Sequence, residues 1–196
     1  MNLTEMRARV REDLQDTDAL NYRWTDDEVG GAIDRVVTEY SLHAPIEQQD
    51  DIATTDGNTE LDISSLSGLL EIVSVEFPIG QSPKYYQRTE YWAGHLYMED
   101  EGNGNDARVK WLKKHTLTAE STSIPTEHEE IIVLGATGYL AMSASAYTVD
   151  RASIAGRHAT INFKAWGKER LDRYDKKLKA VSRTSKVIPH QLYTDE

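Results

Sequence analysis

The stretch Tyr22-Arg23-Trp24-Thr25-Asp26-Asp27-Glu28 contains the clearest structural signature in the sequence. The Thr25 hydroxyl can accept a hydrogen bond from the backbone N–H of Glu28, and the Glu28 carboxylate can accept one from the N–H of Thr25. The two aspartates between them favour the positive end of a helix dipole. This capping box predicts a helix that begins directly after Thr25.

Apolar residues continue that helix towards Pro45, which ends it. They recur at helical spacing: Val29, Ile33, Val36, Val37 and Tyr40. Trp24 is placed to pack against Val29 as a hydrophobic staple. The pair Gly30-Gly31 weakens the helix, and we expect another backbone to approach closely there.

Three more helices are predicted. One runs from Thr4 to Gln15, and another follows a second capping box, with Thr126 as the N-cap and Glu129 at position N3, to about Val149. Small residues fill this helix, so a neighbouring helix can approach it closely. The last helix spans residues 157–182. Its apolar stripe is Phe163, Leu171, Tyr174, Leu178 and Val181.

The region between these helices reads as β structure. Leu69–Phe77 alternates in part, and Arg108–Leu112 and His115–Glu120 also read as strands. The predicted fold class is therefore α+β, a bundle of about four helices with an inserted small antiparallel β unit and an extended C-terminal tail. The expected segments are N-terminal bundle helices (1–45), the β-rich insertion (46–124), C-terminal bundle helices (125–183) and the tail (184–196).

Composition excludes several classes of protein. The chain has 196 residues, no cysteine and a formal net charge of −11. It has no disulfide, thiolate zinc site or cysteine nucleophile. No apolar run approaches the roughly 20 residues that cross a bilayer, and the start Met1–Glu5 does not resemble a signal peptide. We expect a protein made in the cytosol that has no membrane partner.

The charge is divided unevenly along the chain. Residues 1–156 hold 12 basic and 28 acidic side chains, whereas residues 157–186 hold ten basic and three acidic ones. A basic arm on an acidic body indicates an anionic partner, or pairing between neighbouring subunits. The basic residues expected at a partner or channel are Lys164, Lys168, Arg170, Arg173, Lys176, Lys177, Lys179 and Arg183. The alternatives are a solvated helix face and a nucleic-acid-binding accessory protein that uses residues 157–186.

No constellation of catalytic residues is apparent. The sequence has no phosphate-binding glycine loop and no G-x-S-x-G elbow. His128-Glu129-Glu130 begins like a zincin helix, but Ile132 stands where the second histidine is required. The acidic segment Glu99–Asp106 does not match an EF-hand and reads as a solvated loop. We expect no enzymatic activity, no catalytic residue, no cofactor and no metal.

The expected C-terminal tail contains several apolar residues, which are costly to expose to solvent. It contains Lys186, Val187, Ile188, Pro189, His190, Gln191, Leu192 and Tyr193. Pro189 bars a helix and favours extended backbone at Ile188. Such segments commonly add a strand to a partner or fill its pockets, so this tail is the candidate partner-binding segment. The alternative is that it folds back on its own domain.

The order of elements resembles a known family. Leu3–Arg11, Tyr22–Glu28 and the helix Ala32–Tyr40 are similar to the N-termini of head–tail connector, or adaptor, proteins of tailed bacteriophages and related viruses. The small-residue helix, the long final helix and the extended tail fit the same pattern. The resemblance covers the helical parts, and the β insertion fits it loosely.

The resemblance implies a structural virion protein of the neck, assembled in the host cytoplasm. It implies a dodecameric ring that docks beneath the portal protein, meets the tail or the next neck protein and continues the channel through which genome DNA passes. On this chain the portal grip would fall on Lys186–Tyr193, and the basic helix would lie near the portal or the channel.

Overall fold

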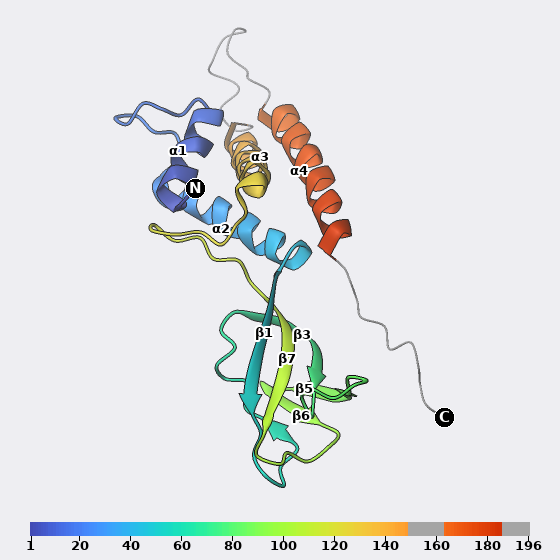
Figure 1. Cartoon of the computed structure of the whole chain (residues 1–196). Coiled ribbons are helices and arrows are strands. Elements are labelled where there is room, and N and C mark those ends of the chain that lie inside the picture. Colours follow the sequence, from blue (N-terminus) through green and yellow to red (C-terminus); the bar gives the residue numbers. More distant parts are fainter. Residues whose placement is uncertain (149–162, 186–196) are drawn as a thin grey trace. The chain divides into compact units, whose positions relative to one another are not determined.

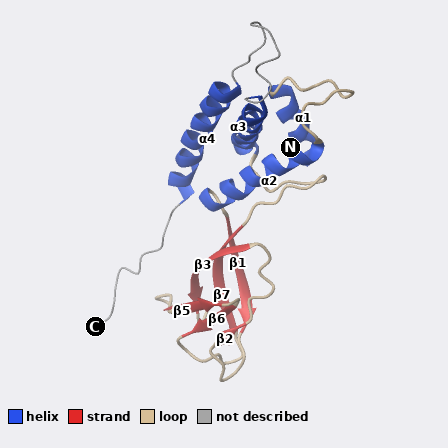
Figure 2. Cartoon of the chain, turned by 180° about the vertical axis from the view of Figure 1, so that it is seen from behind, coloured by secondary structure: helices blue, strands red, loops and turns tan. Residues whose placement is uncertain are grey.

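A computed structural model describes residues 1–148 and 163–185 (Figure 1). It confirms the predicted α+β class. The helices in this part of the chain are α1 (Leu3–Asp13), α2 (Asp26–His43), the short 3₁₀ helix η1 (Thr126–His128), α3 (Glu129–Thr148) and α4 (Phe163–Ser185). Residues 157–162 of the predicted last helix, and the predicted tail from Lys186, lie outside the described residues. The described residues divide into a helical unit (1–44, 115–148 and 163–185) and a β unit (45–114) (Figure 2).

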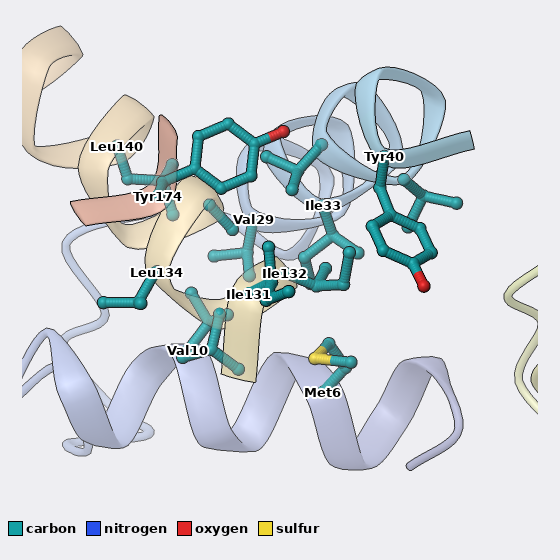
Figure 3. Close-up of a cluster of buried hydrophobic side chains, with 14 of the residues drawn as sticks. Met6, Val10, Val29, Ile33, Tyr40, Ile131, Ile132, Leu134, Leu140 and Tyr174 are labelled. Carbon is teal, nitrogen blue, oxygen red and sulfur yellow. The ribbon is translucent and has the colours of Figure 1, made fainter. Parts of the chain in front are cut away.

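The helical unit has one apolar core, to which all four long helices contribute. Figure 3 shows Met6 and Val10 on α1 beside side chains of α2 and α3. The buried members labelled there are Met6, Val10, Val29, Ile33, Tyr40, Ile131, Ile132, Leu134, Leu140 and Tyr174. The predicted stripe of α4 is confirmed: Tyr174 and Leu178 are buried, and its other three members pack against the core partly buried.

Small residues bring α3 and α4 close together, as predicted. A Cβ atom added at Gly167 would lie 3.2 Å from the carbonyl oxygen of Gly138 and 3.0 Å from the Cβ of Ala141. One added at Gly138 would lie 2.8 Å from Leu171 side-chain atoms. Such distances are shorter than carbon contacts in a packed core. The glycines therefore set the separation of the two helices.

The first capping box is confirmed and the second is wrong. The backbone N–H of Glu28 donates to Thr25 Oγ1 at 3.2 Å, and that of Thr25 donates to Glu28 Oε2 at 2.7 Å. At the second site η1 begins after Pro125 and has no side-chain cap. The Glu129 carboxylate instead accepts a hydrogen bond from the amino group of Met1.

The expected backbone approach at Gly30-Gly31 is also wrong. A Cβ at Gly30 would lie 2.7 Å from Nη2 of Arg7, so a side chain of α1 occupies the space, not a backbone. Apart from its chain neighbours and the nearby backbone of its own helix, no heavy atom of the described structure lies within 4 Å of a Cβ at Gly31. Gly31 is exposed in mid-helix without a packing role.

A pair of alanine substitutions should therefore have opposite effects. Gly31→Ala should stabilise the protein by about 0.5–1 kcal/mol, because it removes the entropic cost of glycine in a helix. Gly135→Ala should destabilise it by about 1–3 kcal/mol, because the new Cβ would lie 2.9 Å from both methyl groups of Val36. Urea unfolding of the two variants measures both changes, and a Gly135→Ala protein as stable as Gly31→Ala would contradict this packing.

The β unit consists of two antiparallel sheets. Its strands are β1 (Ile46–Ala53), β2 (Glu60–Leu61), β3 (Leu69–Glu76), β4 (Tyr86–Gln87), β5 (Thr89–Trp92), β6 (His95–Met98) and β7 (Asp106–Lys113). Their orders are β1-β7-β3-β4 and β2-β6-β5. A second apolar cluster, which includes Val75, Val109, Trp111, Leu61 and Leu96, joins the two sheets.

The strand predicted at His115–Glu120 is wrong. The segment makes only an isolated bridge, between Leu117 and Thr122. His115 binds the helical unit instead: its backbone N–H donates to Ser41 Oγ at 3.0 Å, and its Nε2 lies 2.8 Å from the carbonyl oxygen of Ala44. Burial lowers the pKa of His115. These contacts place residues 115–124 in the helical unit.

Candidate partner-binding surface on the helical unit

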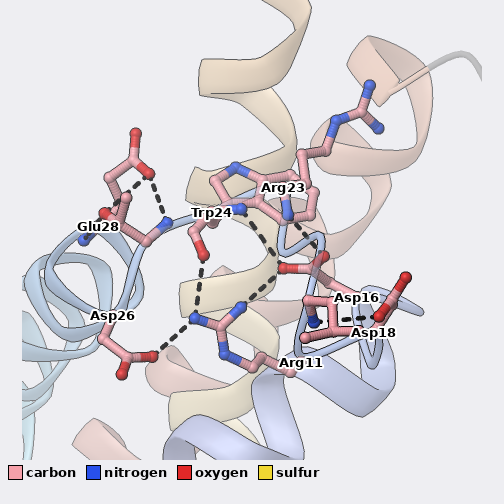
Figure 4. Close-up of polar contacts among 9 residues, drawn as sticks. Arg11, Asp16, Asp18, Arg23, Trp24, Asp26 and Glu28 are labelled. Atoms are coloured by element: carbon pink, nitrogen blue, oxygen red, sulfur yellow. Dashed lines mark hydrogen bonds and ion pairs between the residues drawn. The ribbon is translucent and has the colours of Figure 1, made fainter.

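A buried arginine holds the loop between α1 and α2 (Figure 4). The Arg11 guanidinium donates to Asp16 Oδ2 at 2.7 Å, to the carbonyl oxygen of Trp24 at 2.9 Å and to Asp26 Oδ1 at 2.7 Å. Its plane lies over the ring of Tyr22, 3.7 Å from the centroid. One side chain of α1 thus binds the two residues on either side of the N-cap of α2.

Asp16 completes this network from the other side. Its carboxylate accepts a hydrogen bond from the backbone N–H of Arg23 at 2.8 Å. The hydrogen bond from Arg11 lowers the pKa of Asp26. The motif Tyr22–Glu28 therefore connects α1 to the start of α2.

Helix α4 uses part of its positive charge inside its own unit. Arg170 pairs with Asp13 of α1 at 2.8 Å, and Lys177 pairs with Glu130 of α3 at 2.8 Å. The ammonium group of Lys177 lowers the pKa of Glu130. These two basic residues, predicted at a partner or channel, connect α4 to its neighbours. Arg173 pairs with Glu169 on α4 itself at 2.6 Å.

Four other lysines of α4 point to solvent, and we call them the lysine row. They are Lys164, Lys168, Lys176 and Lys179, and all are exposed. Among the described residues no carboxylate oxygen lies within 4.0 Å of their ammonium groups. Their spacing places them within an arc of about 120° on the helix, where Asp172 and Asp175 are also exposed. Arg183 lies in α4, but its side chain is outside the described part.

A carboxylate on α2, which the sequence analysis missed, fixes α4 in orientation. Glu39 Oε2 accepts hydrogen bonds from the hydroxyls of Tyr139 at 2.9 Å and Tyr174 at 3.1 Å. Arg35 donates to its other oxygen at 3.0 Å. Burial and the Glu39 charge raise the pKa of Tyr174, so this hydroxyl remains a donor. The lysine row is therefore held on the side of α4 away from the core.

Comparisons with known proteins find distant similarities to solved structures. No family model and no curated protein match the sequence. A chain in the virion of the native gene transfer agent (GTA) particle is similar at 11% identity and a TM-score of 0.34, over 98% of this chain and 92% of that one.

Two further similar chains belong to the neck of GTA particles. One is from the empty particle, computed with C6 symmetry, at 9% identity and a TM-score of 0.30, over 89% of this chain and 88% of that one. The other is from the native particle, computed with C12 symmetry, at 8% identity and a TM-score of 0.29, over 85% and 86% of the two chains. At such values the likeness says nothing about what this chain binds.

The remaining predicted sites can be placed only in part. The tail residues Lys186–Tyr193 lie outside the described structure. In residues 1–148 and 163–185 no group of three or more histidine, aspartate or glutamate side chains is arranged to hold a metal ion. No described helix is long and apolar enough to cross a membrane. Among the predicted partner residues that the structure describes, the four lysines of the lysine row are thus the ones without a carboxylate partner.

Proposed function

We propose that this chain is a non-enzymatic structural protein of a virion neck. It forms a ring adaptor, dodecameric as the sequence resemblance implies, which docks on the portal protein and continues the DNA channel towards the tail. The tail segment Lys186–Tyr193 binds the portal. The motif Tyr22–Glu28 and the helix after it support this proposal by their resemblance to connector proteins.

The observation that supports it best is the lysine row on a chain of net charge −11. A closed ring needs two different surfaces on each copy, because every interface joins one face to another. The lysine row and the excess of carboxylates elsewhere on the chain provide two such surfaces of opposite charge. The same acid excess is suited to a channel that lets DNA pass without binding it tightly.

Electron microscopy of the purified full-length chain tests the proposal, alone and mixed with purified portal rings. We expect closed rings of this chain seated on one end of the portal. A chain that stays monomeric at every concentration and leaves portal rings unoccupied would contradict the proposal.

The lysine row also favours a second candidate function, a nucleic-acid-binding accessory protein. Four unpaired cations along one helix attract phosphates, and each phosphate contact adds about 0.9 to the slope of log affinity against log salt. If the chain is an adaptor, we expect weak binding to duplex DNA at physiological salt, nearly unchanged when Lys164, Lys168, Lys176 and Lys179 become glutamine. Tight, salt-dependent binding that this variant loses would favour the second candidate. Fluorescence anisotropy measures both.

A further inference from the structure

The sheet β2-β6-β5 has one apolar face, and its opposite face carries acidic and aromatic side chains. Leu61 pairs with Leu96 across β2 and β6, and both side chains are buried in the core of the β unit. Because side chains alternate along a strand, their neighbours point the other way. The pairs on that opposite side are Glu60 with Tyr97, Glu90 with Tyr97, and Trp92 with His95.

These five residues form what we call the aromatic–acidic face. It consists of Glu60, Glu90, Trp92, His95 and Tyr97. Trp92 is 72% exposed and Tyr97 is 37% exposed, although both are large apolar side chains. His95 and Glu60 contact each other through Nδ1 and Oε1. Exposed aromatic side chains gathered on one face commonly mark an interaction site.

A tight hairpin presents this face. Ala93 and Gly94, which join β5 to β6, both have positive φ angles, of 49° and 89°. Two such residues form the two-residue turn whose twist matches that of paired strands. The turn places Trp92 directly opposite His95 at the end of the hairpin. Strand β5 is also the edge of its sheet, so no strand of the described chain covers it.

The chemistry of the face fits lysine and arginine side chains. Aromatic rings attract cations over their faces, and carboxylates at the rim pair with them. Phosphate is the wrong ligand, because residues 45–114 hold 13 acidic and six basic side chains and would repel it. A cationic protein surface therefore suits this face better than nucleic acid does.

We propose that the aromatic–acidic face receives the lysine row of α4 from a second copy of this chain. The two surfaces are complementary in charge: the row has four lysines with no carboxylate in contact among the described residues, although Asp172 and Asp175 share their arc. The face has exposed rings beside Glu60 and Glu90. This inference rests on the proposed ring and specifies its subunit interface. Every copy then contributes the row on one side and the face on the other.

Cysteine pairing between copies tests this interface, and the natural chain contains no cysteine that would interfere. Full-length Glu90→Cys and Lys176→Cys chains are mixed in equal amounts under mild oxidation and separated by mass. We expect the mixed disulfide in clear excess over random pairing. Leu42→Cys, an exposed residue of α2, replaces Lys176→Cys as the control and should give random pairing.

The outcomes separate the interface from the ring. Rings by electron microscopy together with random Glu90–Lys176 pairing would overturn this interface and leave the adaptor proposal intact. A wild-type chain that is monomeric by sizing, together with random pairing of the Glu90→Cys and Lys176→Cys chains, would overturn both.

A second variant measures the contribution of the aromatic side chain. Trp92→Ala should raise the concentration at half-assembly by about tenfold or more, as truncation of a central aromatic side chain does in other interfaces. Leu20→Ala, at an apolar side chain exposed to 92% in the α1–α2 loop, should leave this concentration unchanged. Equal effects of the two substitutions would overturn the inference.

Discussion

Replacement of Arg11 by methionine should lower the free energy of unfolding by about 3–5 kcal/mol, the usual cost of removing one partner from a buried ion pair. The Arg11 side chain is 6% exposed and that of Asp16 is 7% exposed. Methionine fills much of the space but leaves the Asp16 carboxylate buried without its cation. The carbonyl oxygen of Trp24 loses its guanidinium donor as well. Urea unfolding followed by circular dichroism measures the change.

The same helix provides a matched control. Arg9 also pairs with a carboxylate, that of Glu12, but both side chains are about 60% exposed to solvent. Arg9→Met should therefore change the stability by no more than about 0.5 kcal/mol. If the two variants unfolded at the same urea concentration, the Arg11 network would not be what stabilises the connection of α1 to α2.

Deletion of residues 186–196 should abolish docking onto portal rings while the helical unit stays folded. The described core is closed by side chains of α1, α2, α3 and α4 and includes Tyr174 and Leu178 on the last helix. We therefore expect the helical unit to fold without the tail, whose apolar residues Val187, Ile188, Leu192 and Tyr193 are suited to a partner. Co-sedimentation with portal rings measures docking, and thermal unfolding measures the fold.

A shorter deletion separates the effect of the apolar tail residues on docking from the effect of the last three residues. Removal of residues 194–196 takes away Thr194, Asp195 and Glu196 and keeps the proposed grip. This variant should dock as the full chain does. Full docking by the longer deletion would contradict the role of the tail, and early unfolding of that variant would show that the tail belongs to the domain.

Helix positions were predictable where local chemistry decides them. The Thr25–Glu28 box formed because both partners are free to bond with each other. The Thr126–Glu129 pair has the same spacing, yet Glu129 bonds to Met1, which is 128 residues away in sequence. No local pattern indicates a competing partner at that distance. The β5–β6 hairpin was missed because its turn, Ala93-Gly94, places alanine at a positive φ, where glycine or asparagine is usual.

The basic helix illustrates the same limit at the candidate site. Its sequence shows eight basic residues in the predicted site but not which of them are already paired. Arg170 bonds to Asp13, 157 residues away, and Lys177 to Glu130 on another helix. Which basic residues bond within the helical unit, and which form the exposed lysine row, depends on how α4 packs. That packing depends on glycines and on the Glu39–Tyr174 hydrogen bond, which periodicity alone does not reveal.

The two ends of the β unit are neighbours in one ladder. Ile46, the first residue of β1, pairs with Lys113, the last of β7. The two chain connections between the β unit and the helical unit therefore start from adjacent residues of one strand pair. Domains whose two ends lie close together are readily inserted into other domains. In evolutionary terms the β unit is an insertion that one recombination site could exchange or shorten, and the helical core, which contains no residue of the β unit, would keep its side chains.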